Sequence, residues 1–125
     1  MAKSNKIRLS DFAPQKTDVI TFDSNILIKL LYPTISEKAP IAAYEDLYAK
    51  ILRAGSSLII SSVQISEFVN RCIRFQFALF KDSENNPSLD FKRDYRSTKD
   101  YSNSMKAILD IIQTDIIPNY TFVDD

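Results

Sequence analysis

Hydrophobic residues fall into short, dense runs along the chain, and three of these runs predict strands. Residues 19–22 (VITF) and 58–60 (LII) are apolar and rich in β-branched side chains, and polar residues that favour helix starts follow each of them. Runs of this kind are typical of strands buried in a parallel sheet. Residues 119–123 (NYTFV) form a third, more polar run near the end of the chain. We therefore predict three short strands.

Between these runs, apolar residues recur at the three-to-four-residue spacing of amphipathic helices. Pro33 ends the first helical segment, and Pro40 lies in the opening turn of the second, where proline is tolerated. Gly55 stands where a left-handed residue terminates a helix, which explains its presence without any ligand. The sequence predicts helices over residues 26–31, 36–54, 63–80 and 93–116.

The predicted order is strand, helix pair, strand, helix pair, strand. This alternation indicates an α/β fold with a parallel sheet and right-handed crossovers. Three strands are few for such a sheet. The length of 125 residues suits one domain, so we interpret residues 1–17 as an N-terminal arm and residues 18–125 as the domain.

Composition excludes several kinds of site. The sequence has no histidine, one cysteine (Cys72) and one glycine (Gly55), so it contains no Ser-His-Asp triad, internal disulfide, CxxC metal site or Gly-rich phosphate loop. Cys72 lies in the apolar stripe of a predicted helix, which favours a core role. Carboxylates are the remaining candidates for chemistry, and they favour hard cations such as Mg²⁺ or Mn²⁺.

Charge is balanced overall, with 16 basic and 16 acidic residues, which excludes a bulk polycation. Residues 71–106 nevertheless carry eight basic and five acidic residues. This segment is either a solvated helix face or a surface for a polyanion. No apolar run is long enough to span a bilayer, and with a single cysteine this predicts a cytoplasmic protein. The candidate phosphate contacts are Arg71, Arg74, Lys92, Arg93 and Arg96.

Two acidic residues follow the first two predicted strands. Asp23 comes directly after the first strand, where it is either an ordinary helix N-cap or a functional acid. Glu67 lies in the second turn of the helix after the second strand, and Arg71 four residues later offers a surface ion pair as the alternative role. If the two strands are neighbours, both acids open onto the same sheet edge, where ligands gather in parallel α/β folds. Two carboxylates placed close together repel each other, and a cation bound between them would remove this repulsion.

The segments that carry these acids resemble two motifs of the PIN-domain family. Residues 19–28 (VITFDSNILI) resemble the family's opening strand, Asp-Ser/Thr-Asn turn and short apolar helix. Residues 58–68 (LIISSVQISEF) resemble its second motif, a strand followed by a Ser/Thr-capped helix that carries a glutamate. The resemblance covers about residues 18–123. It implies a three-layer α/β/α fold and an Mg²⁺- or Mn²⁺-dependent ribonuclease, often the toxin of a bacterial toxin–antitoxin pair.

The resemblance also implies roles for individual residues. Asp23 and Glu67 would be the catalytic acids and metal ligands, and Asn25 would support Asp23 by hydrogen bonding. Ser24 and Ser62 would orient these groups. The expected partners are an RNA substrate and an antitoxin protein, with no membrane.

The sequence departs from the family pattern in its C-terminal part. PIN domains carry a third acid, and often a fourth, beyond the third strand, and neither Asp124 nor Asp125 fits those positions. The sheet is therefore expected to be incomplete at the C-terminus, which favours a homodimer through uncovered apolar faces. A truncated PIN-like chain acting as a non-catalytic interaction module is the alternative. A phosphoryl-acceptor domain built on Asp23 is disfavoured, because that pattern needs an aspartate where Asn25 stands.

Overall fold

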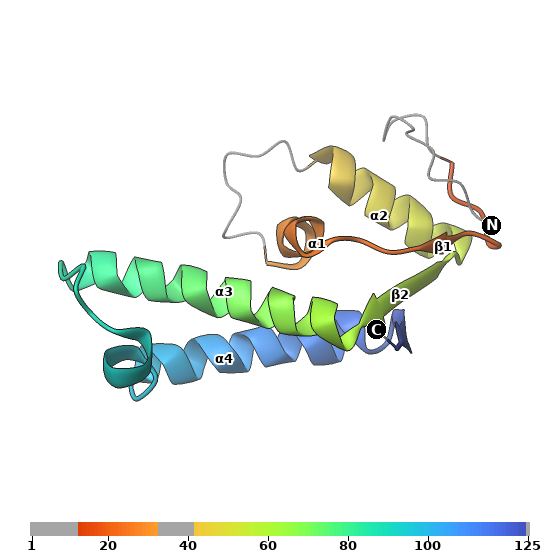
Figure 1. Cartoon of the computed structure of the whole chain (residues 1–125). Coiled ribbons are helices and arrows are strands. Elements are labelled where there is room, and N and C mark those ends of the chain that lie inside the picture. Colours follow the sequence, from red (N-terminus) through yellow and green to blue (C-terminus); the bar gives the residue numbers. More distant parts are fainter. Residues whose placement is uncertain (1–12, 33–41, 125) are drawn as a thin grey trace.

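The computed structural model describes residues 13–32 and 42–124 (Figure 1). The predicted arm falls mostly outside these residues, as do the predicted helix start at 36–41 and Asp125. The described elements, in order, are β1 (Val19–Ile20), α1 (Ser24–Leu31), α2 (Ala42–Ala54), β2 (Ser57–Ser61), α3 (Ser62–Ser83), the π-helical turn η3 (Phe91–Tyr95), α4 (Lys99–Ile111), the π-helical turn η4 (Ile112–Ile116) and β3 (Tyr120–Val123).

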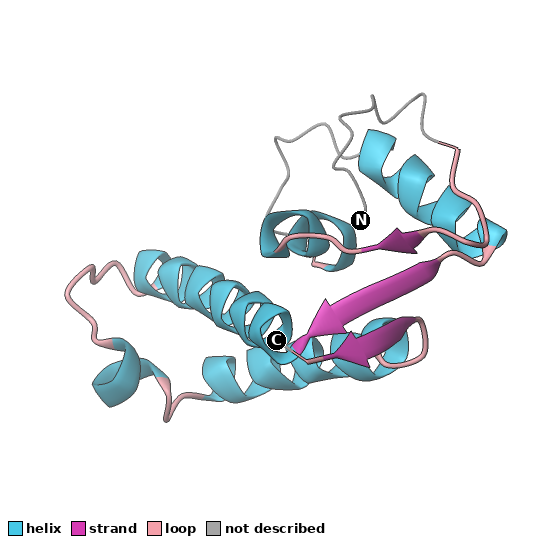
Figure 2. Ribbon diagram, turned by 45° about the vertical axis from the view of Figure 1, so that its right-hand side comes forward, coloured by secondary structure: helices cyan, strands magenta, loops and turns pink. Residues whose placement is uncertain are grey.

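The three strands form one parallel sheet in the order β1-β2-β3, which confirms the predicted α/β class and the pairing of the first two strands (Figure 2). Ile20 aligns with Leu58, and Leu58 aligns with Tyr120. β1 has two residues only, because the chain leaves the sheet at Thr21 and runs towards α1. The central strand β2 thus provides most of the sheet's pairing.

Burial alternates along the central strand β2 and indicates which sheet face the helices cover. Leu58 and Ile60 are 2% and 0% exposed, and Tyr120 on β3 is 6% exposed. On β3, Phe122 aligns with Ile60 on that face but is 53% exposed. On the opposite face, Val19 is 66% exposed and Val123 is 39% exposed. Within the described residues, the helices therefore cover one sheet face and form two layers, where the resemblance to PIN domains implies three.

Helix α3 lies at the centre of the helical layer, in contact with α1 and α4 (Figure 1). Its Phe68 and Cys72 are fully buried, which confirms the core role predicted for Cys72. Ile51 of α2 and Ile108 of α4 are fully buried in the same hydrophobic cluster. One core therefore joins the sheet to the helices.

The single helix predicted over residues 93–116 is wrong, because the chain turns between η3 and α4. The Thr98 hydroxyl accepts a hydrogen bond from the Tyr101 backbone N–H at 3.1 Å and starts a new helix. The turn places Tyr95, which is fully buried, against several aromatic rings. These ring contacts, with centroids 5.1–5.7 Å away, come from Phe77, Phe80, Phe91 and Tyr101.

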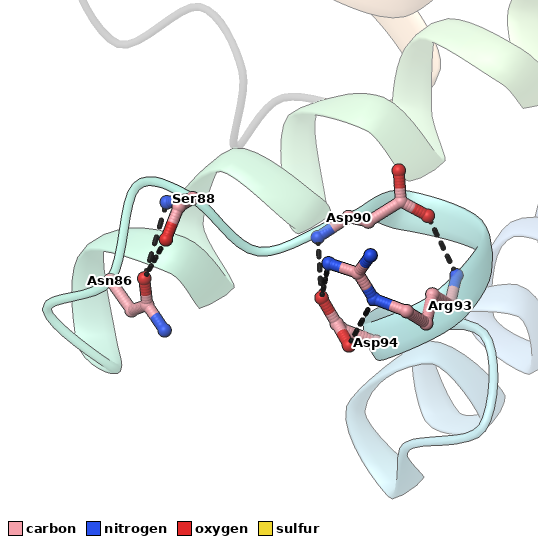
Figure 3. Close-up of polar contacts among 5 residues, drawn as sticks. All are labelled: Asn86, Ser88, Asp90, Arg93 and Asp94. Carbon is pink, nitrogen blue, oxygen red and sulfur yellow. Dashed lines mark hydrogen bonds and ion pairs between the residues drawn. The ribbon is translucent and has the colours of Figure 1, made fainter.

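The loop between α3 and η3 is organised by its own polar side chains (Figure 3). Asn86 Oδ1 accepts hydrogen bonds from the Ser88 N–H and hydroxyl at 3.2 and 2.7 Å. Asp90 accepts from the Arg93 N–H at 2.8 Å, and Asp94 accepts from the Asp90 N–H at 2.7 Å. An ion pair of 3.1 Å joins Arg93 to Asp94 and lowers the pKa of the Asp94 carboxyl. The charge of Arg93 is therefore paired within its own turn.

We expect Gly55→Ala to lower the free energy of unfolding by about 1 kcal/mol, because Gly55 has φ +73° and an alanine there is strained. The nearest atom to an added Cβ is Lys16 Cγ at 4.0 Å, so no clash adds to this cost. Urea unfolding measures the effect. Gly55→Asn is the matched control, and its free energy of unfolding should fall by less, because asparagine tolerates the left-handed region. Equal losses in the two variants would contradict this explanation.

Burial raises the pKa of the Cys72 thiol from 9.0 to about 12. Between these values the unfolded chain loses a proton that the folded chain keeps, so stability falls as the pH rises. The expected slope from this group is up to ~1.4 kcal/mol per pH unit. Urea unfolding between pH 8 and 10 should show a steeper decline for the natural protein than for Cys72→Ala. The same decline in both proteins would contradict the prediction.

Candidate functional site

Two strand-to-helix junctions meet at the carboxyl edge of the sheet because β1 and β2 are parallel neighbours. At the first junction, Asp23 caps α1, and its Oδ1 accepts from the Ile26 N–H at 3.0 Å. At the second, Ser61 caps α3, and its hydroxyl accepts from the Gln64 N–H at 3.2 Å. Both caps were predicted from residue type, and both helices begin at this edge.

Gln64 links the two junctions directly. Its Oε1 accepts from the Ser61 N–H at 2.8 Å, which completes the capping box. Its Nε2 donates to Thr21 Oγ1 at 2.9 Å and to the Phe22 carbonyl at 2.8 Å. The spacing of Ser61 and Gln64 in the sequence is that of a capping box, whereas the bonds to Thr21 and Phe22 have no local signal in the sequence.

The Asp-Ser-Asn turn lies against Glu67 on α3. The Ser24 hydroxyl donates to Glu67 Oε2 at 3.3 Å across 43 positions of sequence. Ser24 is 7% exposed and is the buried polar residue of the described chain, whereas Asp23 and Glu67 are exposed. The two segments that resemble PIN motifs are therefore in contact. Ser24, which we expected to orient the acids, forms a hydrogen bond with Glu67.

Asn25 contacts a residue that the sequence did not indicate as its partner. Its Oδ1 accepts from the Arg71 guanidinium at 2.8 Å, whereas we expected Asn25 to support Asp23. Among residues 13–32 and 42–124, the ion pair present is Arg93–Asp94. The alternative ion pair between Glu67 and Arg71 is thus not formed in the described part of the chain.

The other candidates add no further acid to this pair. Ser62 is exposed at the first position of α3, and Asp124 is exposed directly after β3. No group of three or more His, Cys, Asp or Glu side chains that could hold a metal ion occurs among the described residues. The third and fourth acids of the family pattern therefore have no counterpart in this part of the chain.

The donor chemistry of Asp23 and Glu67 suits a hard divalent cation. Both are exposed carboxylates, and the Ser24 hydroxyl and the Asn25 amide oxygen lie in the turn that follows Asp23. Mg²⁺ is commonly held by one or two carboxylates, with water and substrate phosphates completing its shell. The residues present fit such an ion.

The remaining basic candidates occupy different environments. The Arg74 guanidinium lies over the Phe91 ring, 3.9 Å from its centroid, and Arg93 pairs with Asp94. Arg96 lines an open groove of about 380 Å³ between α3, η3 and α4. The groove is mostly apolar and is lined by Ile65, Ser66, Val69, Asn70, Ile73, Phe91, Arg96, Tyr101 and Met105.

No helix of the described chain is long and apolar enough to cross a membrane.

The sequence was also compared with known proteins. It matches no protein-family profile, no curated protein and no solved structure.

Proposed function

We propose that this chain is a metal-dependent endoribonuclease of the PIN type, with Mg²⁺ or Mn²⁺ held by Asp23 and Glu67. The observation that carries the proposal is the contact between Ser24 and Glu67, which joins the two resembling motifs at the sheet edge. Ligands of open parallel sheets bind at this edge. The toxin role and the antitoxin partner rest on the resemblance alone. The homodimer rests on the expected uncovered apolar faces, and the cytoplasmic location rests on the single cysteine and the apolar pattern of the sequence.

The cation supplies a Lewis acid that activates water and stabilises charge on the phosphodiester. Asp23 is fixed by its bond to the Ile26 N–H, which orients the carboxylate at the start of α1. Glu67 is oriented by the Ser24 hydroxyl. Each acid is thus oriented by a hydrogen bond, and among the described residues neither acid forms an ion pair with a basic group.

Exposure of the acid pair suits a polymeric substrate. Asp23 and Glu67 both lie on the surface, so an RNA strand reaches them without opening the core. Two carboxylates repel a phosphodiester, and a bound cation reverses this repulsion. Substrate binding at this edge is therefore expected to depend on the metal.

A non-catalytic interaction module is the second candidate. It is favoured by the finding that the described residues contain no group of three or more potential metal ligands. Such a module predicts no cleavage of RNA in Mn²⁺ and no dependence of partner binding on Asp23. The experiment on the acid pair separates the two candidates.

We expect Asp23→Asn and Glu67→Gln each to weaken Mn²⁺ binding about 10-fold or more, because each removes one of two charged ligands. RNA cleavage in Mn²⁺ should fall ~100-fold or more in either variant. Electron paramagnetic resonance of free Mn²⁺ measures the binding, and single-stranded RNA on denaturing gels reports cleavage. Asp110→Asn, an exposed acid on α4, is the matched control and should change neither.

Cleavage that persists in EDTA or in Asp23→Asn would overturn the nuclease proposal. Mn²⁺ binding that is unchanged in both acid variants would overturn the assignment of the metal ligands. Absence of cleavage by the natural protein, with no Mn²⁺ bound, would favour the interaction module.

A further inference from the structure

Helices α1 and α3 are joined by two neighbouring side-chain hydrogen bonds. Ser24 donates to Glu67 at 3.3 Å, and Arg71 donates to Asn25 at 2.8 Å. Consecutive residues of α1 thus bind residues four apart on α3. Positions i and i+4 share a helix face with Cβ atoms about 5–6 Å apart. Glu67 and Arg71 are therefore neighbours on the face of α3 that contacts the first turn of α1.

Opposite charges at this spacing normally pair, yet Glu67 and Arg71 bind neutral partners. Glu67 accepts from a hydroxyl, and Arg71 donates to an amide oxygen. This arrangement leaves the Glu67 charge available for a cation. A guanidinium has five N–H donors, so the bond to Asn25 leaves others directed away from it. Arg71 is exposed, and among the described residues its guanidinium forms no ion pair and no side-chain hydrogen bond besides the one to Asn25.

Arg74 and Arg93 differ from Arg71 in what their guanidinium groups contact. Arg93 forms an ion pair with Asp94, and Arg74 packs on the Phe91 ring. Arg71 combines a fixed position beside the acid pair with a charge that no acidic residue of the described chain neutralises. A guanidinium fixed in this way suits an anionic ligand.

We propose that Arg71 binds a phosphate of the RNA strand next to the cation held by Asp23 and Glu67, and that Asn25 positions Arg71 for this contact. The planar fork of a guanidinium matches two phosphate oxygens. The hydrogen bond to Asn25 holds the Arg71 side chain in one conformation, so Arg71 loses less conformational entropy when RNA binds. The same bond prevents the guanidinium from pairing with Glu67. The inference rests on the proposed function and names the substrate contact of the same site.

The proposal predicts different effects for substitutions of the two partners. In Arg71→Gln, RNA binding should weaken ~5–10-fold, and the slope of log affinity against log salt should fall by ~0.7, the value for one lost phosphate contact on a single strand. Mn²⁺ binding should stay the same or tighten ~2–5-fold, because a nearby positive charge is removed. A purely structural role for Arg71 would weaken both.

In Asn25→Ala, Arg71 is free to pair with Glu67, so binding of both Mn²⁺ and RNA should weaken. The double variant Asn25→Ala/Arg71→Gln should recover the Mn²⁺ affinity, because the competing guanidinium is gone. Recovery in the double variant measures coupling between the two residues. Arg71→Lys keeps the charge without the fork, and it should bind Mn²⁺ normally and RNA less tightly.

The experiment uses the full chain and two binding measurements. Electron paramagnetic resonance reports Mn²⁺ binding. Fluorescence anisotropy in Mn²⁺ reports binding of a fluorescein-labelled, single-stranded 2′-O-methyl RNA octamer, whose integrity is checked on a gel. Arg53→Gln is the matched control, because it makes the same charge change at an exposed arginine in the last turn of α2, just before β2 begins and so away from the carboxyl edge of the sheet. Circular dichroism confirms folding of each variant.

Equal losses of RNA affinity and salt slope in Arg71→Gln and Arg53→Gln would overturn the phosphate contact. Unchanged Mn²⁺ binding in Asn25→Ala would overturn the positioning role of Asn25. If Mn²⁺ binding requires Asp23 and Glu67 but RNA affinity is unchanged in Arg71→Gln, the phosphate contact of Arg71 is wrong and the proposed function still stands. If the natural protein binds no Mn²⁺, the proposed function fails as well.

Discussion

The side-chain amide of Gln64 holds together the two junctions on which the candidate site is built. Strand β1 has two residues, so its ladder alone is a weak constraint on where the following turn lies. Gln64 adds bonds to Thr21 and Phe22 at that exit while it completes the cap of α3. These bonds fix the Asp-Ser-Asn turn relative to Glu67. The acid pair therefore depends on a neutral amide that has no part in the proposed chemistry.

Neutral side chains also separate the charges at the site. Ser24 and Asn25, in the first turn of α1, form hydrogen bonds with the Glu67 carboxylate and the Arg71 guanidinium on α3. A direct bond between Glu67 and Arg71 would cancel both charges on an exposed surface, where such a pair adds little stability. In the part of the chain that the structure describes, neither Glu67 nor Arg71 forms an ion pair, so an anionic and a cationic residue remain neighbours on α3. A cation and a phosphate are complementary to this pair of charges.

Local signals in the sequence predicted much of the fold. The β-branched runs predicted all three strands, Gly55 marked the end of α2, and Cys72 was placed in the core by its position in an apolar stripe. The contact between the two motifs followed from the rule for parallel sheets. The turn before Thr98 was missed, because it depends on the packing of Tyr95 among distant rings. The partner of Asn25 was missed for the same reason, since no local pattern encodes a bond across 46 positions.

The strand order has a consequence for how the chain assembles during synthesis. Each strand pairs with its neighbour in sequence, so β2 adds to β1 and β3 adds to β2, with no strand inserted between earlier ones. Residues emerge from the ribosome in this same order, and a domain generally folds as one unit. Both junctions of the site belong to the first two strand-helix units, whereas α4 and β3 supply Ile108 and Tyr120 to the shared core. The segments that carry the two acids are therefore synthesised first, and their arrangement becomes stable only when the last strand completes the core.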